Sequence, residues 1–133
     1  MENFMGFCPL KTETTEPAAL AAEYRRAEKA DVLRLGERHL FFRRGMRVYY
    51  IPYGDIQRCF RRVLLVPVKA PRRSVELKVE NLVICDAEKE LAMVQLRDPR
   101  GAASVLERLK KLAPHAAFTK PNPQESPDTG ESE

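Results

Sequence analysis

The fold of this chain is decided by the stretch His39-Leu40-Phe41-Phe42-Arg43-Arg44-Gly45-Met46-Arg47-Val48-Tyr49-Tyr50-Ile51-Pro52-Tyr53-Gly54-Asp55-Ile56. Two runs rich in aromatic and β-branched residues flank Arg44-Gly45, where the glycine can supply the positive φ of a tight hairpin turn. Pro52 has no N–H to donate to a strand ladder, and Gly54-Asp55 is a turn pair. The stretch therefore predicts a β-hairpin that ends in a sharp turn.

The two faces of this hairpin follow from alternation. A two-residue turn at Arg44-Gly45 places Phe41 opposite Val48 and Leu40 opposite Tyr49. We assign one face to the core: His39, Phe41, Met46, Val48 and Tyr50. The other face would be a partly exposed aromatic and basic patch, suited to self-association or partner binding: Leu40, Phe42, Arg47 and Tyr49. Alternatively, an N-terminal helix covers this patch with Leu20 and Tyr24. A register shift of one residue would exchange the two faces.

Length and charge indicate one domain with a basic body. The chain has 133 residues and a net charge of +4, which suits a single core. Residues 31–113 carry +8, whereas residues 1–30 carry −1 and residues 114–133 carry −3. Such a body is expected to associate with acidic surfaces at low salt. No apolar run approaches the roughly 20 residues of a membrane span, and the start lacks the pattern of a signal peptide. Three widely spaced cysteines favour a reducing compartment, so we expect a cytoplasmic protein.

The ends of the chain differ in composition from its middle. Residues 1–13 are expected to form a flexible arm. Residues 14–30 are expected to form a helix, because Thr15 can cap it and Pro17 suits its first turn. Residues 114–133 have almost nothing apolar to bury after Thr119 and are expected to form a disordered acidic tail.

The middle of the chain reads mostly as strands. Extended runs cover residues 32–43, with a break at Gly36-Glu37, then residues 46–51 and 57–66. Two prolines predict a loop over residues 67–73. Residues 75–79 alternate as a half-buried strand does, and the alternation breaks at Asn81, where we expect a bulge or turn. Residues 82–85 and 91–96 then pair across a turn at residues 86–89.

A second helix follows this last hairpin. Asp98 is a natural N-cap and Pro99 suits the first helical position. Residues at three- and four-residue spacing give this helix one apolar face: Ala102, Val105, Leu106, Leu109 and Leu112. Pro114 ends the helix, which is expected to supply core.

Six or seven short strands closed by one amphipathic helix indicate an α+β fold, with a strongly bent antiparallel sheet or partly open barrel. The turn Ile51-Pro52-Tyr53-Gly54-Asp55-Ile56, the hairpin after Leu82-Val83-Ile84-Cys85-Asp86 and the helix after Asp98-Pro99 together resemble bacterial pleckstrin-homology-like domains. The resemblance covers residues 31–113 and leaves the N-terminal helix outside. It implies a non-enzymatic interaction module.

Arginines are the most conspicuous candidate site residues. The resemblance implies phosphate contacts near the first hairpin, where Arg43, Arg44 and Arg47 lie. Arginine suits phosphate because its planar fork offers several donors. The full set of candidates for binding an acidic partner or anionic surface is Arg43, Arg44, Arg47, Arg58, Arg61, Arg62, Arg72 and Arg73. A solvated basic face without a ligand is the alternative.

Two other functions have weaker support. Aromatic residues interleaved with arginines are what a single-stranded nucleic acid needs for stacking, yet no recognised nucleic-acid motif is present. The sequence has no zinc-ligand spacing and no glycine-rich phosphate loop, so we expect no metal and no cofactor. Cys59 and Cys85 lie in apolar runs typical of inert thiols, and His39 fits a core or rim position better than a catalytic base. We therefore expect no enzymatic activity.

Overall fold

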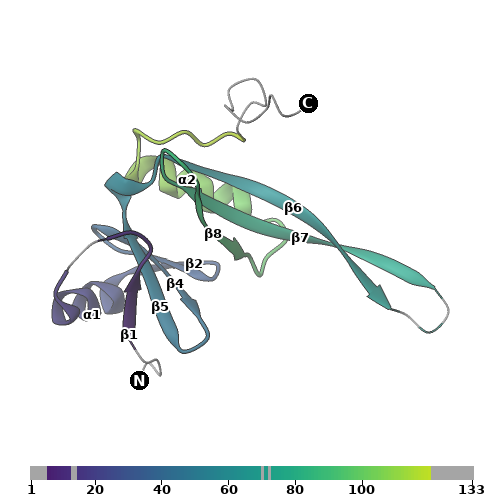
Figure 1. Ribbon diagram of the computed structural model, residues 1–133, viewed down its shortest axis with the longest axis horizontal. Coiled ribbons are helices and arrows are strands. Elements are labelled where there is room, and N and C mark those ends of the chain that lie inside the picture. The colour runs from purple at the N-terminus through teal and green to yellow at the C-terminus, as the bar shows by residue number, and fades with distance from the viewer. Residues whose placement is uncertain (1–5, 13–14, 70, 72, 121–133) are drawn as a thin grey trace.

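The computed structural model describes residues 6–12, 15–69, 71 and 73–120, and in this part of the chain the fold is α+β, as predicted (Figure 1). The first sheet has strand order β1-β5-β4-β3-β2, with β1 (Gly6–Pro9), β2 (Glu28–Ala30), β3 (Leu33–Leu35), β4 (His39–Arg44) and β5 (Arg47–Pro52). The second has order β6-β7-β8, with β6 (Arg58–Lys69), β7 (Ser74–Cys85) and β8 (Glu90–Gln95). Two α-helices, α1 (Pro17–Arg26) and α2 (Ala102–Leu112), and a short 3-10 turn, η1 (Tyr53–Asp55), complete it. The strands form two separate sheets and do not close into a barrel.

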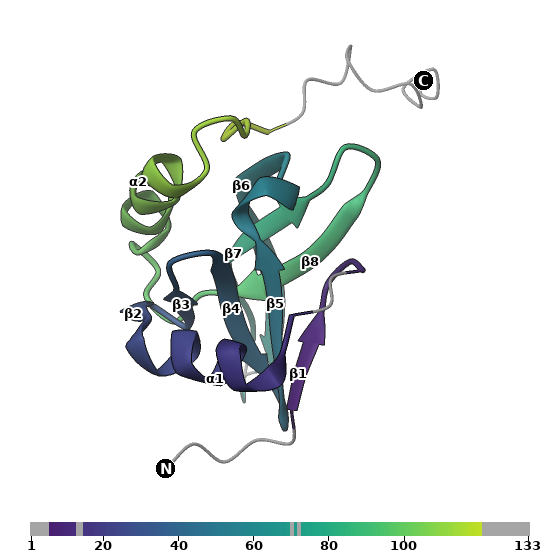
Figure 2. The same ribbon diagram turned by 90° about the vertical axis from the view of Figure 1, so that its left-hand side faces the viewer.

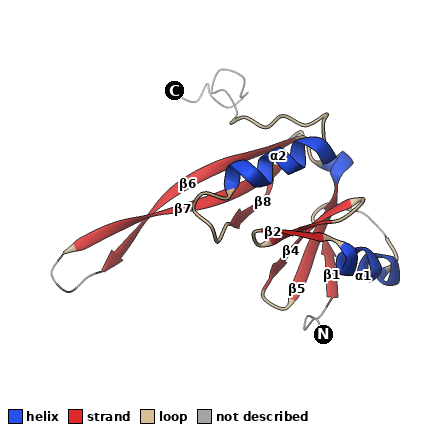
Figure 3. Cartoon of the chain, turned by 180° about the vertical axis from the view of Figure 1, so that it is seen from behind, coloured by secondary structure: helices blue, strands red, loops and turns tan. Residues whose placement is uncertain are grey.

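The main core lies between the two sheets and α2. Leu40 and Phe42 on β4 pack with Leu82 on β7 and with Leu109 on α2. Three residues of the apolar face predicted for α2 pack inward, since Ala102, Val105 and Leu109 are buried, whereas Leu106 is half-buried and Leu112 is exposed. Figure 3 shows α2 lying along the second sheet. This helix therefore supplies core, as its spacing predicts.

A second, smaller core lies on the opposite face of the first sheet, where α1 crosses the strands (Figure 2). Leu20 and Tyr24 of α1 pack there on Phe41, Val48 and Tyr50. The prediction of a partly exposed patch is therefore wrong for two of its residues. Leu40 and Phe42 are only 0% and 2% exposed, because they lie in the main core. Tyr49 is half-buried and stacks on Phe42. The covering helix exists, but it covers the other face of the hairpin.

The hairpin register differs from the predicted one by two residues. The turn is Gly45-Met46, so Arg44 pairs with Arg47 and Phe41 pairs with Tyr50. Gly45 has φ +64, as the first position of a two-residue hairpin turn requires. A shift of two residues leaves each side chain on its predicted face. The composition of the two faces is thus as predicted, although Met46 falls in the turn and is exposed.

The carboxylate of Glu23 fixes α1 to the turn between β3 and β4. Its Oε2 accepts hydrogen bonds from the backbone N–H groups of Arg38 (2.7 Å) and His39 (2.8 Å), and its Oε1 lies 2.8 Å from His39 Nδ1. Gly36 belongs to the same turn, and a Cβ placed there would lie 2.3 Å from Glu23 Oε2. The Tyr53 hydroxyl donates to the Gly36 carbonyl at 2.8 Å. Glycine at this position therefore makes room for a buried carboxylate.

The N-terminal boundaries also differ from the predicted ones. Gly6–Pro9, expected to belong to a flexible arm, forms strand β1 and pairs in parallel with β5. The helix expected over residues 14–30 ends at Arg26, and Glu28–Ala30 pairs with β3 as strand β2. The disordered acidic tail was predicted to begin at residue 114, but Ala117 exchanges backbone hydrogen bonds with Gln57 and Cys59, so its first part is ordered. The rest of the predicted tail, from residue 121 onward, lies outside the described residues.

The β6–β7 hairpin is longer than predicted. Residues 67–73 were expected to form a loop, but β6 continues through Pro67 to Lys69, and Pro67 pairs with Glu76. The proline is tolerated because β6 is an edge strand. No bulge occurs at Asn81, since the register of β7 shifts only between Ile84 and Cys85. The expected burial of Val75 and Leu77 is also wrong, because both are exposed.

The N-terminal cap predicted for α2 at Asp98 is absent. The helix begins at Ala102 after Gly101, and no side-chain cap is present. Asp98 instead accepts a hydrogen bond from the backbone N–H of Arg100 at 2.9 Å, within the preceding turn.

No helix in the described part of the chain is long and apolar enough to cross a membrane.

Candidate anion-binding hollow

A hollow of about 490 Å³ lies where the β2–β3 turn approaches the β4–β5 turn. Its lining includes the apolar residues Val32 and Phe42. Four basic side chains from four places in the chain also line it: Lys29, Arg34, Arg43 and Arg97. Asp31 is the one acidic residue of the lining. The hollow thus combines an excess of positive charge with some apolar surface.

Asp31 holds one wall of the hollow in place. Its carboxylate accepts hydrogen bonds from the backbone N–H groups of Arg97 (2.6 Å) and Asp98 (2.9 Å), which follow β8. Its backbone has φ +60, a left-handed conformation that aspartate tolerates better than most residues. The β2–β3 turn is therefore tied to the segment that carries Arg97, and the negative charge of Asp31 is engaged in those two bonds.

Neighbouring groups position Arg34 and Arg43. Arg34 lies over the Tyr24 ring, 4.2 Å from its centroid, and donates to the Tyr24 carbonyl at 3.1 Å. Arg43 donates through Nε to the Gly45 carbonyl at 3.1 Å. These contacts fix where the two guanidinium groups lie beside the hollow. Guanidinium groups that line one hollow suit a carboxylate or phosphate ligand.

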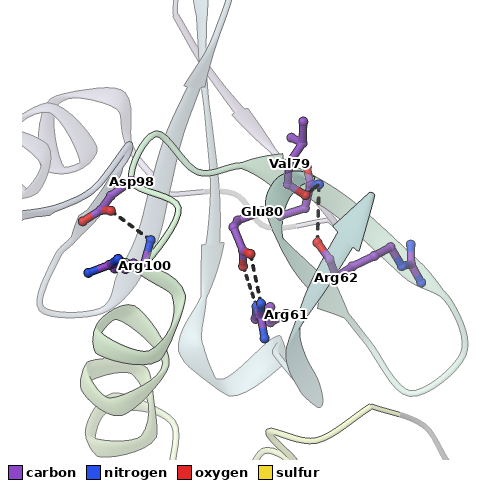
Figure 4. Close-up of polar contacts among 7 residues, drawn as sticks. Arg61, Arg62, Val79, Glu80, Asp98 and Arg100 are labelled. Carbon is purple, nitrogen blue, oxygen red and sulfur yellow. Dashed lines mark hydrogen bonds and ion pairs between the residues drawn. The ribbon is translucent and has the colours of Figure 1, made fainter. Parts of the chain in front are cut away.

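The predicted arginines do not converge on one site. Of the predicted arginines that the structure describes, Arg43 alone lines the hollow. Arg61 makes a two-point contact with the buried carboxylate of Glu80, through Nε at 2.5 Å and Nη2 at 2.9 Å (Figure 4). This hydrogen bonding lowers the pKa of Glu80. Arg62 forms an ion pair with Glu90 and lies over the Phe60 ring. The charges of Arg61 and Arg62 are therefore balanced within the second sheet.

The remaining predicted arginines lie elsewhere. Arg44 donates to the Met93 carbonyl at 2.8 Å, and Arg47 lies 3.5 Å from the Cys8 sulfur. Arg58 donates to the Thr119 carbonyl at 2.6 Å. Arg73 is exposed on the β6–β7 hairpin, whereas Arg72 lies outside the described residues. Arg44, Arg47 and Arg58 therefore contact separate parts of the fold, and none of these three lines the hollow with Arg43.

Three residues of the hollow were missing from the sequence-based candidates: Lys29, Arg34 and Arg97. Each is a single basic residue in a mixed segment, and Arg97 is far along the chain from Lys29 and Arg34, which pair with each other across β2 and β3. They come together only because the β2–β3 hairpin pairs beside β4 and because Asp31 captures the backbone after β8. No local pattern in the sequence marks such a juxtaposition.

The groups considered for catalysis are engaged or inert. Burial raises the pKa of Cys59 to about 12, and it also raises the pKa of Cys85, so both thiols stay protonated near neutral pH. His39 is buried against Glu23, and His115 Nε2 lies 3.0 Å from the Ile56 carbonyl oxygen. Cys59, Cys85 and His39 are thus buried in the packing of the fold.

Comparison of the chain with protein-family models, with curated proteins and with solved structures finds no match. The resemblance to pleckstrin-homology-like domains therefore stays a prediction from element order, and the function has to be argued from the hollow itself.

Proposed function

We propose that this protein is a non-enzymatic interaction module that binds an acidic segment of a partner protein in the basic hollow. The observation that carries the proposal is the convergence of Lys29, Arg34, Arg43 and Arg97 from separate elements on one cavity. Guanidinium groups bind carboxylates through paired, charge-assisted hydrogen bonds. Val32, which is half-buried in the same lining, suits a segment that carries an apolar side chain beside its acidic ones.

Binding of single-stranded nucleic acid has less support than it had from the sequence. Stacking requires accessible aromatic faces. Phe41, Phe42, Tyr50 and Tyr53 are buried, and Tyr49 is half-buried against Phe42. The hairpin therefore offers no row of exposed rings to bases.

Reversing one charge in the hollow tests the proposal. Arg43→Glu should weaken binding of a short acidic peptide about tenfold at low salt, because it removes a charge-assisted contact and adds repulsion. The difference should shrink as salt screens the charges. Fluorescence anisotropy of a labelled poly-glutamate peptide measures both effects.

Arg25→Glu is the matched control, because Arg25 is exposed on α1 and does not line the hollow. It changes the net charge by the same amount and should leave the affinity near that of the parent protein. Equal losses from the two variants would show that only overall charge matters and would contradict the hollow. Stronger binding to phosphatidylserine vesicles or single-stranded DNA than to the peptide, lost in Arg43→Glu, would assign the hollow to that ligand instead.

A further inference from the structure

The second sheet extends into a two-stranded arm, formed by residues 63–69 of β6 and 74–80 of β7 (Figure 1). β8 pairs only with Asn81–Cys85, so it stops where the arm begins. On one face of the arm Leu64 pairs with Val79, Val66 with Leu77 and Val68 with Val75. Leu77 is 53% exposed. An exposed aliphatic strip of this length is typical of a surface that meets a partner.

The two edges of the arm differ. Cys59 donates its backbone N–H to Ala117 on the side away from β7. Alternate residues of a strand point the same way, so Pro67 faces that outer side and offers no donor there. A proline at this position protects the β6 edge from pairing with another strand.

The β7 edge of the arm has no such protection. Leu96 donates its N–H to the Glu80 carbonyl on the side facing β8. By the same alternation, the backbone groups of Glu76 and Lys78 point to this side, and in the described part of the chain no strand pairs with them. We call residues 75–79 of β7 the open edge, because the Glu80 carbonyl already accepts from Leu96. Their sequence alternates Val75, Leu77 and Val79 with Glu76 and Lys78.

We propose that two copies of this chain pair through the open edge, with β7 antiparallel to β7 of the second copy about a two-fold axis at Leu77. Glu76 then lies opposite Lys78 of the second copy, and Lys78 lies opposite its Glu76. Val75 lies opposite Val79, and the two Leu77 side chains meet at the axis. Opposite charges directly across strands stabilise pairing, and the aliphatic strips join into one surface.

This register is selected by charge, by side-chain direction and by the space beside β7. An axis at Val79 would also pair opposite charges, Lys78 with Glu80, but the Glu80 carbonyl already accepts a hydrogen bond from Leu96. If the two-fold axis lay at Glu76, the two Glu76 side chains would face each other, and an axis at Lys78 would do the same for the two lysines. Like charges directly opposite each other destabilise a strand pair. A shift by an odd number sets charged residues opposite aliphatic ones and mismatches the hydrogen-bonding edges. A self-complementary edge is what a two-fold dimer requires.

The corner beside the open edge has room for the second copy. A hollow of about 240 Å³ is lined by Val79 and Glu80 on β7 and by Leu96 and Pro99 after β8. In the proposed register Val75 of the second copy lies opposite Val79, and therefore beside this hollow. The hollow thus lies where β8 no longer covers β7 and the second copy would pair.

Charge reversal with rescue tests the dimer in the full-length protein. Lys78→Glu and Glu76→Lys should each raise the dimer dissociation constant about tenfold or more, because each creates two like-charge pairs across the axis. The double variant Glu76→Lys/Lys78→Glu restores both opposite-charge pairs and should return the constant to within about threefold of the parent. Sedimentation equilibrium measures the constant, and thermal unfolding checks that each variant is folded.

Lys69→Glu is the control, because Lys69 is exposed on β6, away from the open edge. It makes the same charge change as Lys78→Glu and should leave the dimer unchanged. A parent protein that stays monomeric at roughly 100 µM overturns the proposal. A dimer that resists both single reversals, or that the double variant does not restore, overturns it as well. Peptide binding in the hollow is measured separately, so either proposal can fail without the other.

Discussion

Replacing Gly36 with alanine should lower the free energy of unfolding by about 3 kcal/mol. The new Cβ would lie 2.3 Å from Glu23 Oε2, so the carboxylate has to move. Movement breaks its hydrogen bonds to the backbone N–H groups of Arg38 and His39 and leaves a buried charge poorly satisfied. Urea denaturation of the two proteins measures the loss.

Gly54→Ala is the matched control, since a Cβ at Gly54 meets nothing within 4 Å. It should leave stability nearly unchanged. A double-mutant cycle sharpens the test: in a Glu23→Ala background the Gly36→Ala change should cost much less, because the clashing carboxylate is gone. Full additivity of the two changes would show that the Glu23–Gly36 contact does not cause the loss.

Leu109→Ala should destabilise the protein by about 2–5 kcal/mol, the usual range for a buried leucine. Leu109 is 1% exposed and packs in the core between the two sheets. The expected cost combines lost burial with the cavity left behind. Thermal or urea unfolding monitored by circular dichroism gives the value.

Leu112→Ala on the same helix provides the comparison, because Leu112 is 37% exposed. It should cost far less, although the helix propensity change is the same. A loss below about 0.5 kcal/mol for Leu109→Ala would mean that α2 does not dock on the sheets as described.

Local sequence patterns predicted most of the elements. The spacing of Val105 and Leu109 predicted the buried face of α2, and the aromatic and β-branched runs predicted β4 and β5. The faces of that hairpin were also predicted, although the turn lies at Gly45-Met46. Alternation determines which face a residue lies on, so both registers give the same faces. Glycine can occupy either position of a two-residue turn, so the sequence did not distinguish a turn at Arg44-Gly45 from one at Gly45-Met46.

Burial on both sides of the hairpin could not be predicted from the hairpin itself. One side depends on α1, whose position is determined by the contact of Glu23 with the turn at Gly36. This contact joins distant parts of the chain through backbone donors, which leave no mark in the sequence. The length of β6 was not predicted for another reason. Pro67 would be excluded from a central strand, but an edge strand tolerates a proline whose missing N–H would face the unpaired side.

The candidate site was predicted only in part. The excess of arginine in the middle of the chain is real, but pairing with Glu80 and Glu90 engages Arg61 and Arg62 within the sheet. Arg43 is the shared member of the predicted set and the hollow. Its partners depend on where hairpins from different regions meet, which is a property of tertiary structure.

The central claim is that an acidic segment binds in the hollow, and the most direct test is a nuclear magnetic resonance titration of the isotope-labelled protein with a short poly-glutamate peptide. The account predicts that the amide signals of residues 29–34, 43–45 and 97 shift in a saturable way, while those of the arm scarcely move. Shifts confined to residues 58–73, or spread evenly over every basic residue, would contradict it.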